Sequence, residues 1–119
     1  MTDVEIFHNP ACSKSRGAMQ ILSARDVTTS VTEYLKAPPE RATVERIVDI
    51  LDDEPAALVR KDSRFKELGL AAGDFVTRDA VVELLLAHPE LMERPVVIVG
   101  DRAVIARPPE KLLELLGRP

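Results

Sequence analysis

The chain is 119 residues long, which fits one domain, and its 45% hydrophobic and 30% charged content is typical of a folded, soluble protein. The net charge of −4 and the 3% aromatic content argue against a general binder of nucleic acid or of an anionic membrane surface. Cys12 is the only cysteine, which excludes an internal disulfide, a cysteine-rich zinc site and an internal Cys-x-x-Cys pair.

The first third of the chain predicts a β-α-β unit. Residues 4–8 alternate in polarity like a strand, Asn9-Pro10 marks a turn, and the pattern from Ser13 onward is helical. The β-branched run 27–34 predicts a second strand. Because the connection between the strands carries a helix, we expect them to be parallel. Cys12 then lies where the first strand has ended and the first helix begins.

The middle of the chain predicts helices. Apolar residues at 44, 47, 48 and 51 follow helical spacing, with Thr43 as the expected N-cap. Further helical segments are expected from Pro55 through Arg60, over 65–68 before Gly69, and from a Thr77 N-cap to a stop at Pro89.

The last third returns to strands. The apolar run 96–99 is typical of a buried central strand, Gly100-Asp101 predicts a hairpin turn, and 103–106 predicts a fourth strand. Pro108-Pro109 opens a terminal helix that Gly117 closes. The order β-α-β, helical block, β-β-α predicts one α/β domain over 1–119. We expect a thioredoxin-like mixed four-stranded sheet, with a helical insertion at about 40–90 between strands 2 and 3.

The position of Cys12 predicts a nucleophile. A thiol attacks only as thiolate, and the free N–H groups and dipole of a helix N-terminus stabilise that anion. His8, which titrates near neutrality, and Ser15 are candidates to support the thiolate. The alternative for Cys12 is a buried structural cysteine, which the polar sequence Cys-Ser-Lys-Ser-Arg disfavours. The alternative for His8 is an ordinary strand residue with a local hydrogen bond.

Three arginines fall at the ends of predicted elements. Arg60 closes the short helix, while Arg94 and Arg107 flank the predicted hairpin at the same end of the sheet. Guanidinium groups bind tetrahedral oxyanions in a bidentate manner, although solvated surface arginines are equally compatible with the spacing. Pro95 is expected to be structural at the site, either as a cis proline that places backbone beside the thiol or as an ordinary trans proline.

These residues together resemble the glutaredoxin-coupled arsenate reductases of thioredoxin-like fold, a family related to the Spx-type regulators. The similarity rests on the loop from Ile6 to Arg16, on 34–39 and on 58–61, followed in order by Arg94-Pro95 and Arg107-Pro108. It covers nearly the whole chain. The resemblance implies arsenate reduction and arsenic resistance, with Cys12 as catalytic nucleophile and Arg60, Arg94 and Arg107 as oxyanion ligands.

The resemblance also implies the partners of the reaction. Arsenate would form an adduct with Cys12, and electrons would come from glutathione, an external co-substrate, and from glutaredoxin. A lone cysteine fits this scheme because it has no internal resolving thiol. We expect no bound cofactor or metal, no direct nucleic-acid contact, no membrane association, a cytoplasmic location and a monomer.

Two other functions share this fold and this cysteine. One is a redox-responsive regulator of the Spx type, which usually carries Cys-x-x-Cys where this chain has Cys12 and Ser15. The other is a monothiol oxidoreductase without arsenate activity. The phosphatase-like arsenate reductases are excluded, because they need an arginine six residues after the cysteine and this chain has Ala18 there.

Overall fold

The computed structural model describes residues 3–116, so Gly117 lies outside the described residues. Its sheet has four strands in the order β2-β1-β3-β4, where β1 is parallel to β2 and antiparallel to β3. The strands are β1 Val4–His8, β2 Thr29–Glu33, β3 Val96–Val99 and β4 Arg102–Ile105. The predicted α/β fold with a mixed sheet is confirmed, as is the parallel pairing of its first two strands.

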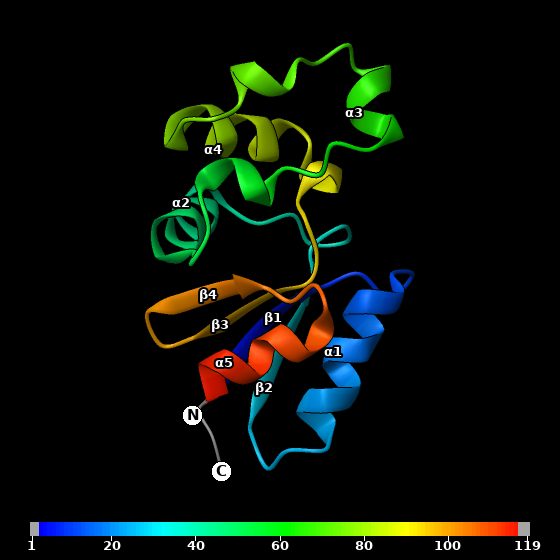
Figure 1. Cartoon of the computed structure of the whole chain (residues 1–119), viewed down its shortest axis with the longest axis vertical. Coiled ribbons are helices and arrows are strands. Elements are labelled where there is room, and N and C mark those ends of the chain that lie inside the picture. The colour runs from blue at the N-terminus through cyan, green and yellow to red at the C-terminus, as the bar shows by residue number, and fades with distance from the viewer. Residues whose placement is uncertain (1–2, 117–119) are drawn as a thin grey trace.

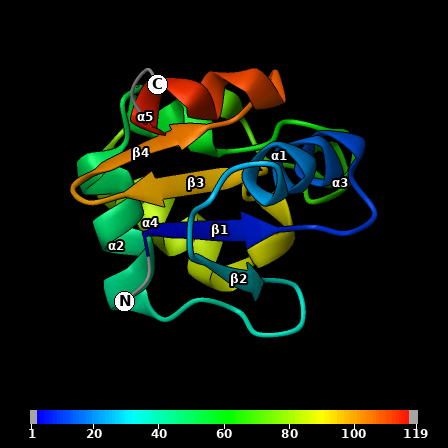
Figure 2. The same cartoon turned by 90° about the horizontal axis from the view of Figure 1, so that it is seen from below.

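Helices cover both faces of this sheet. The α-helices are α1 Ser13–Ser23, α2 Arg41–Ile50, α3 Ser63–Glu67, α4 Arg78–Ala87 and α5 Leu113–Leu116. Helices α1 and α5 lie on one face, and α2, α3 and α4, which connect β2 to β3, lie beyond the other (Figures 1 and 2). Within residues 3–116, no helix is long and apolar enough to cross a membrane.

The core lies on both sides of the central strands. Val96, Val97 and Ile98 of β3 are all buried, which explains the continuous apolar run, because successive side chains point to opposite faces. Ile6 and Val97 pack with α1, and Phe7 and Val96 pack with the insertion helices. The edge strand β2 needs no such run, and its sequence Thr-Ser-Val-Thr-Glu is correspondingly polar.

Several predicted boundaries were wrong. Thr43 is not the N-cap of α2, because the extended backbone after Pro39 lets the helix start earlier, and Glu40 is the N-cap. The segment expected to be helical through Arg60 is a 3-10 helix over Pro55–Leu58 only. The chain turns extended there because Val59 forms an antiparallel bridge with Met92.

Other elements differ by a residue or a turn. The second strand covers 29–33 rather than 27–34, and the fourth runs Arg102–Ile105 rather than 103–106. The terminal helix starts as a 3-10 turn, Pro109–Leu112, before α5. Thr77 caps α4 as predicted, its side chain accepting a hydrogen bond from the backbone N–H of Ala80 at 3.2 Å.

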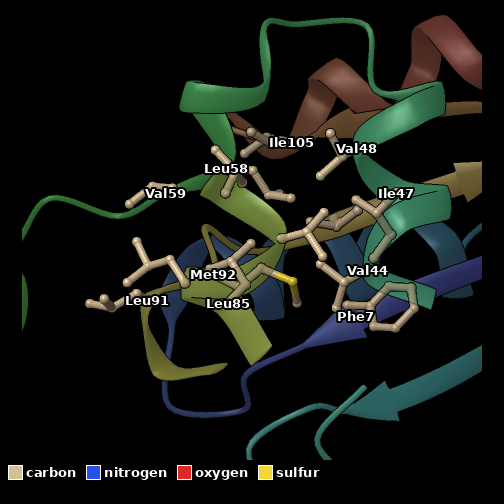
Figure 3. Close-up of a cluster of buried hydrophobic side chains, with 14 of the residues drawn as sticks. Phe7, Val44, Ile47, Val48, Leu58, Val59, Leu85, Leu91, Met92 and Ile105 are labelled. Carbon is tan, nitrogen blue, oxygen red and sulfur yellow. The ribbon is translucent and has the colours of Figure 1, made fainter. Parts of the chain in front are cut away.

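A buried apolar cluster holds two segments together, one inside the insertion and one just before β3. Leu58 and Val59 of the insertion pack beside Leu91 and Met92, all of them almost fully buried (Figure 3). Backbone hydrogen bonds join the same segments, from Arg60 N to Leu91 O at 2.6 Å and from Glu93 N to Leu58 O at 2.8 Å. The insertion is therefore anchored beside the entry to β3.

Candidate active site

Cys12 is the N-cap residue of α1, as the sequence predicts. Its N–H donates to Asn9 O at 3.0 Å, and its carbonyl accepts from the Arg16 N–H at 3.0 Å. The Asn9 side chain closes the turn by accepting from the Ala11 N–H at 3.0 Å. The loop after β1 is thus tied at several points, and it presents the thiol to the first turn of the helix.

The electrostatics of this position favour the thiolate. Burial alone would raise the pKa of Cys12, but the effects of the backbone N–H groups of Ser15 and Lys14 and of the Arg94 guanidinium outweigh it. The pKa of Cys12 is therefore lowered to about 7. A thiol with such a pKa is substantially ionised at neutral pH and is a competent nucleophile.

Arg94 and Arg107 meet at the thiol. Arg107 Nη1 donates to Cys12 Sγ at 3.8 Å and to the carbonyl of Arg94 at 3.0 Å. Both arginines precede prolines, and the Arg94–Pro95 and Arg107–Pro108 peptide bonds are cis. Antiparallel β3 and β4 bring these two ends of the hairpin together, from positions that are 13 residues apart in the sequence.

Arg60 reaches the same region through carboxylates. Its Nε donates to Asp62 at 2.9 Å and its Nη1 to Glu93 at 3.1 Å. The same Glu93 oxygen lies 3.7 Å from Arg107 Nη1. The structure thus links Arg60 to Arg107 through Glu93, whereas Arg107 itself contacts the thiol.

The two predicted supports of the thiolate occupy different places. Ser15 is fully buried, and its hydroxyl accepts a hydrogen bond from the Asn9 N–H at 3.3 Å, so its contribution to Cys12 is through its backbone N–H. His8 takes part in none of the hydrogen bonds found at Cys12 among residues 3–116. Burial, with a smaller effect of Arg16, lowers the pKa of His8 and outweighs the opposing effect of Glu33. The lowered pKa favours the neutral imidazole at pH 7.

Two residues of the site were missed at the sequence level. Glu93 carries no motif signal beyond its place directly before Arg94. The sequence places Tyr34 at the end of a strand and in the segment 34–39 of the resemblance, but it does not indicate a role at the site. Tyr34 is fully buried, and the Arg94 guanidinium and the Asn9 side chain affect its pKa. Burial raises the pKa of Tyr34 overall. Its hydroxyl and Arg94 Nε are buried without hydrogen-bond partners in the part of the chain that the structure describes.

The groups present at this site support thiol and oxyanion chemistry. A thiolate at a helix N-terminus faces guanidinium groups that can neutralise an incoming anion. Within residues 3–116, His, Cys, Asp and Glu side chains form no group of three or more that could hold a metal ion.

Comparison with known proteins finds similarity over nearly the full chain. The sequence model of the ArsC family matches residues 7–115. The uncharacterized protein YfgD of Escherichia coli K12 is 38% identical over 116 residues, which are 96% of this chain and 97% of that protein. An arsenate reductase of Neisseria meningitidis serogroup B is 37% identical over 118 residues, covering 98% of this chain and all of that one.

A solved structure gives the same result in three dimensions. The arsenate reductase from Vibrio cholerae superposes with a TM-score of 0.83 at 36% identity, covering 94% of this chain and 96% of that one. The similarity therefore includes the sheet, the insertion and the segments that carry the cysteine and the arginines.

Proposed function

Because the chain belongs to the ArsC family, as its motifs predict, we propose that it reduces arsenate to arsenite with Cys12 as the nucleophile. The observation that carries this proposal is the contact of Cys12 Sγ with Arg107 Nη1 at 3.8 Å, at the N-terminus of α1. A thiol with a pKa of about 7 beside two arginines suits attack on a tetrahedral oxyanion.

In the first step, the Cys12 thiolate attacks arsenic, an S–As bond forms, and one arsenate oxygen leaves as water after protonation. Arg94 and Arg107 would offset the negative charge that otherwise keeps the arsenate and the thiolate apart. Arg60 would bind the oxyanion with the guanidinium nitrogen that its two carboxylate partners leave free. Pro95 would hold the backbone beside the thiol.

The chain needs an external reductant for the second step, since it has a single thiol. Glutathione would replace a second oxygen on arsenic, with loss of water. A glutaredoxin thiolate would then attack the glutathione sulfur, and the electron pair of the breaking S–As bond would reduce As(V) to As(III). Hydrolysis of the remaining Cys12–arsenic bond would release arsenite and restore the thiol. We place this cycle in the cytoplasm, in a monomer without a resident cofactor.

The test is arsenate-dependent oxidation of NADPH in the presence of glutathione, glutaredoxin and glutathione reductase. We expect turnover by the wild type and none by Cys12→Ser. Absence of turnover by the intact protein would refute the proposal. Glutathionylation of Cys12 without arsenate turnover would identify a monothiol oxidoreductase instead. Omitting glutaredoxin, then glutathione, tests which thiol is required at each stage.

A further inference from the structure

Glu93 lies at the centre of the charged groups around the site. One of its carboxylate oxygens accepts hydrogen bonds from Arg60 Nη1 at 3.1 Å and from the backbone N–H of Arg94 at 3.3 Å. The same oxygen is 3.7 Å from Arg107 Nη1. The side chain is 20% exposed, so these partners hold it in a largely desolvated position.

The contacts of Glu93 form part of a continuous chain of charged groups. Asp62 holds Arg60, Arg60 bonds to Glu93, and Glu93 adjoins Arg107, whose Nη1 also touches Cys12 Sγ. The backbone of Glu93 is fixed too, by its hydrogen bond to Leu58 O at 2.8 Å. A carboxylate anchored in this way can set where two guanidinium groups stand relative to the thiol.

We propose that Glu93 is a positioning residue that orients Arg60 and Arg107 for oxyanion binding beside Cys12, without touching the oxyanion itself. The proposal rests on the proposed function, because it assigns Glu93 a task at the same site. Three arginines crowded together repel one another, and a carboxylate between two of them offsets that repulsion and defines their directions. The gain in oxyanion affinity from well-placed Arg60 and Arg107 then outweighs the repulsion between Glu93 and the incoming anion.

Glu93→Gln keeps the shape of the side chain and removes one negative charge. If the main effect of Glu93 were to repel the incoming oxyanion, or to occupy the oxyanion site as a competitor, this substitution would strengthen oxyanion binding. If Glu93 positions the arginines, the substitution weakens binding despite the gain in net positive charge.

The experiment measures how sulfate, an unreactive tetrahedral oxyanion, protects Cys12 from alkylation by iodoacetamide. We expect the half-protecting sulfate concentration to be about five- to tenfold higher in Glu93→Gln than in the wild type, the usual scale for the net loss of one hydrogen bond. Glu93→Asp, which keeps the charge on a shorter side chain, should fall between them. Turnover with arsenate should show a raised KM with a smaller change in kcat.

The matched control is Glu90→Gln, which makes the same change at an exposed ion pair with Arg64 and should leave protection unchanged. Equal or tighter protection in Glu93→Gln overturns the proposal, as does absence of protection in both wild type and variant. Because sulfate protection requires no turnover, a chain that fails to reduce arsenate still tests the role of Glu93. The two failures are therefore distinguishable.

Discussion

The lowered pKa of Cys12 predicts a large effect of Arg94→Met on thiol reactivity. With a pKa of about 7, half of Cys12 is thiolate at pH 7. The substitution removes both the hydrogen bond and the positive charge of Arg94 and leaves the opposing effect of burial in place. The N–H groups of Ser15 and Lys14 also remain, so a full return of the pKa to the ordinary value of about 8.5 is the limiting case. In that limit only about 3% of Cys12 is thiolate at pH 7, so alkylation should slow by up to roughly 15-fold.

The assay is the rate of iodoacetamide alkylation between pH 5 and 10, which reports on one group because Cys12 is the only cysteine. Arg41→Met is the control, since Arg41 pairs with Glu83 on the exposed surface of the insertion and should leave the midpoint near pH 7. Circular dichroism establishes that both variants are folded. An unchanged midpoint in Arg94→Met would refute the assignment of Arg94 as a main stabiliser of the thiolate.

The remaining predictions concern stability, measured by urea unfolding. Tyr34→Phe removes a buried hydroxyl without a hydrogen-bond partner among residues 3–116, so it should raise the free energy of unfolding by about 1 kcal/mol. A lower free energy of unfolding would indicate that the Tyr34 hydroxyl forms a hydrogen bond. Gly17→Ala should destabilise by about 1 kcal/mol despite better helix propensity, because its Cβ would lie 2.8 Å from Pro109 Cγ; a gain would mean that this proline shifts freely. Thr77→Ala removes the N-cap bond to Ala80 N and should cost about 1 kcal/mol, whereas Thr77→Ser should cost little.

Cys12 itself links pH to stability in a defined direction. Its folded pKa of about 7 lies below the value of about 8.5 expected for the unfolded thiol. The contribution to stability is therefore fully present above pH 8.5 and is lost as the pH falls through about 7. In Cys12→Ser this part of the pH profile should disappear, which differential unfolding across that range would detect.

Much of the fold could be predicted because local patterns and the global fold agree. The buried run 96–99, the turn at Gly100 with φ of 62°, and the Thr77 cap each have one strong local cause. The placement of Cys12 follows from the end of one strand and the start of one helix. Proximity of Arg94 and Arg107 follows from hairpin geometry, since each borders an antiparallel strand.

The errors arise where tertiary contacts decide. The short helix stops at Leu58 because Val59 pairs with Met92, a residue more than 30 positions away that no local pattern identifies. The same pairing brings Glu93 to Arg60. Tyr34 looks like the end of a polar strand, and its burial against the site depends on the insertion that follows it.

The contacts of the three arginines therefore predict separable tasks, although the sequence makes them look equivalent. Arg94 acts on the thiolate by hydrogen bond and charge, and Arg107 contacts Sγ directly. Arg60 is already engaged by Asp62 and Glu93, so much of its charge is offset before an oxyanion arrives. Loss of Arg60 should consequently affect oxyanion affinity while leaving the pH midpoint of Cys12 alkylation near 7, whereas loss of Arg94 should move both. If Arg60→Met shifted the midpoint as far as Arg94→Met, the arginines would act as one shared positive field, and the contacts of Glu93 would have no directional role.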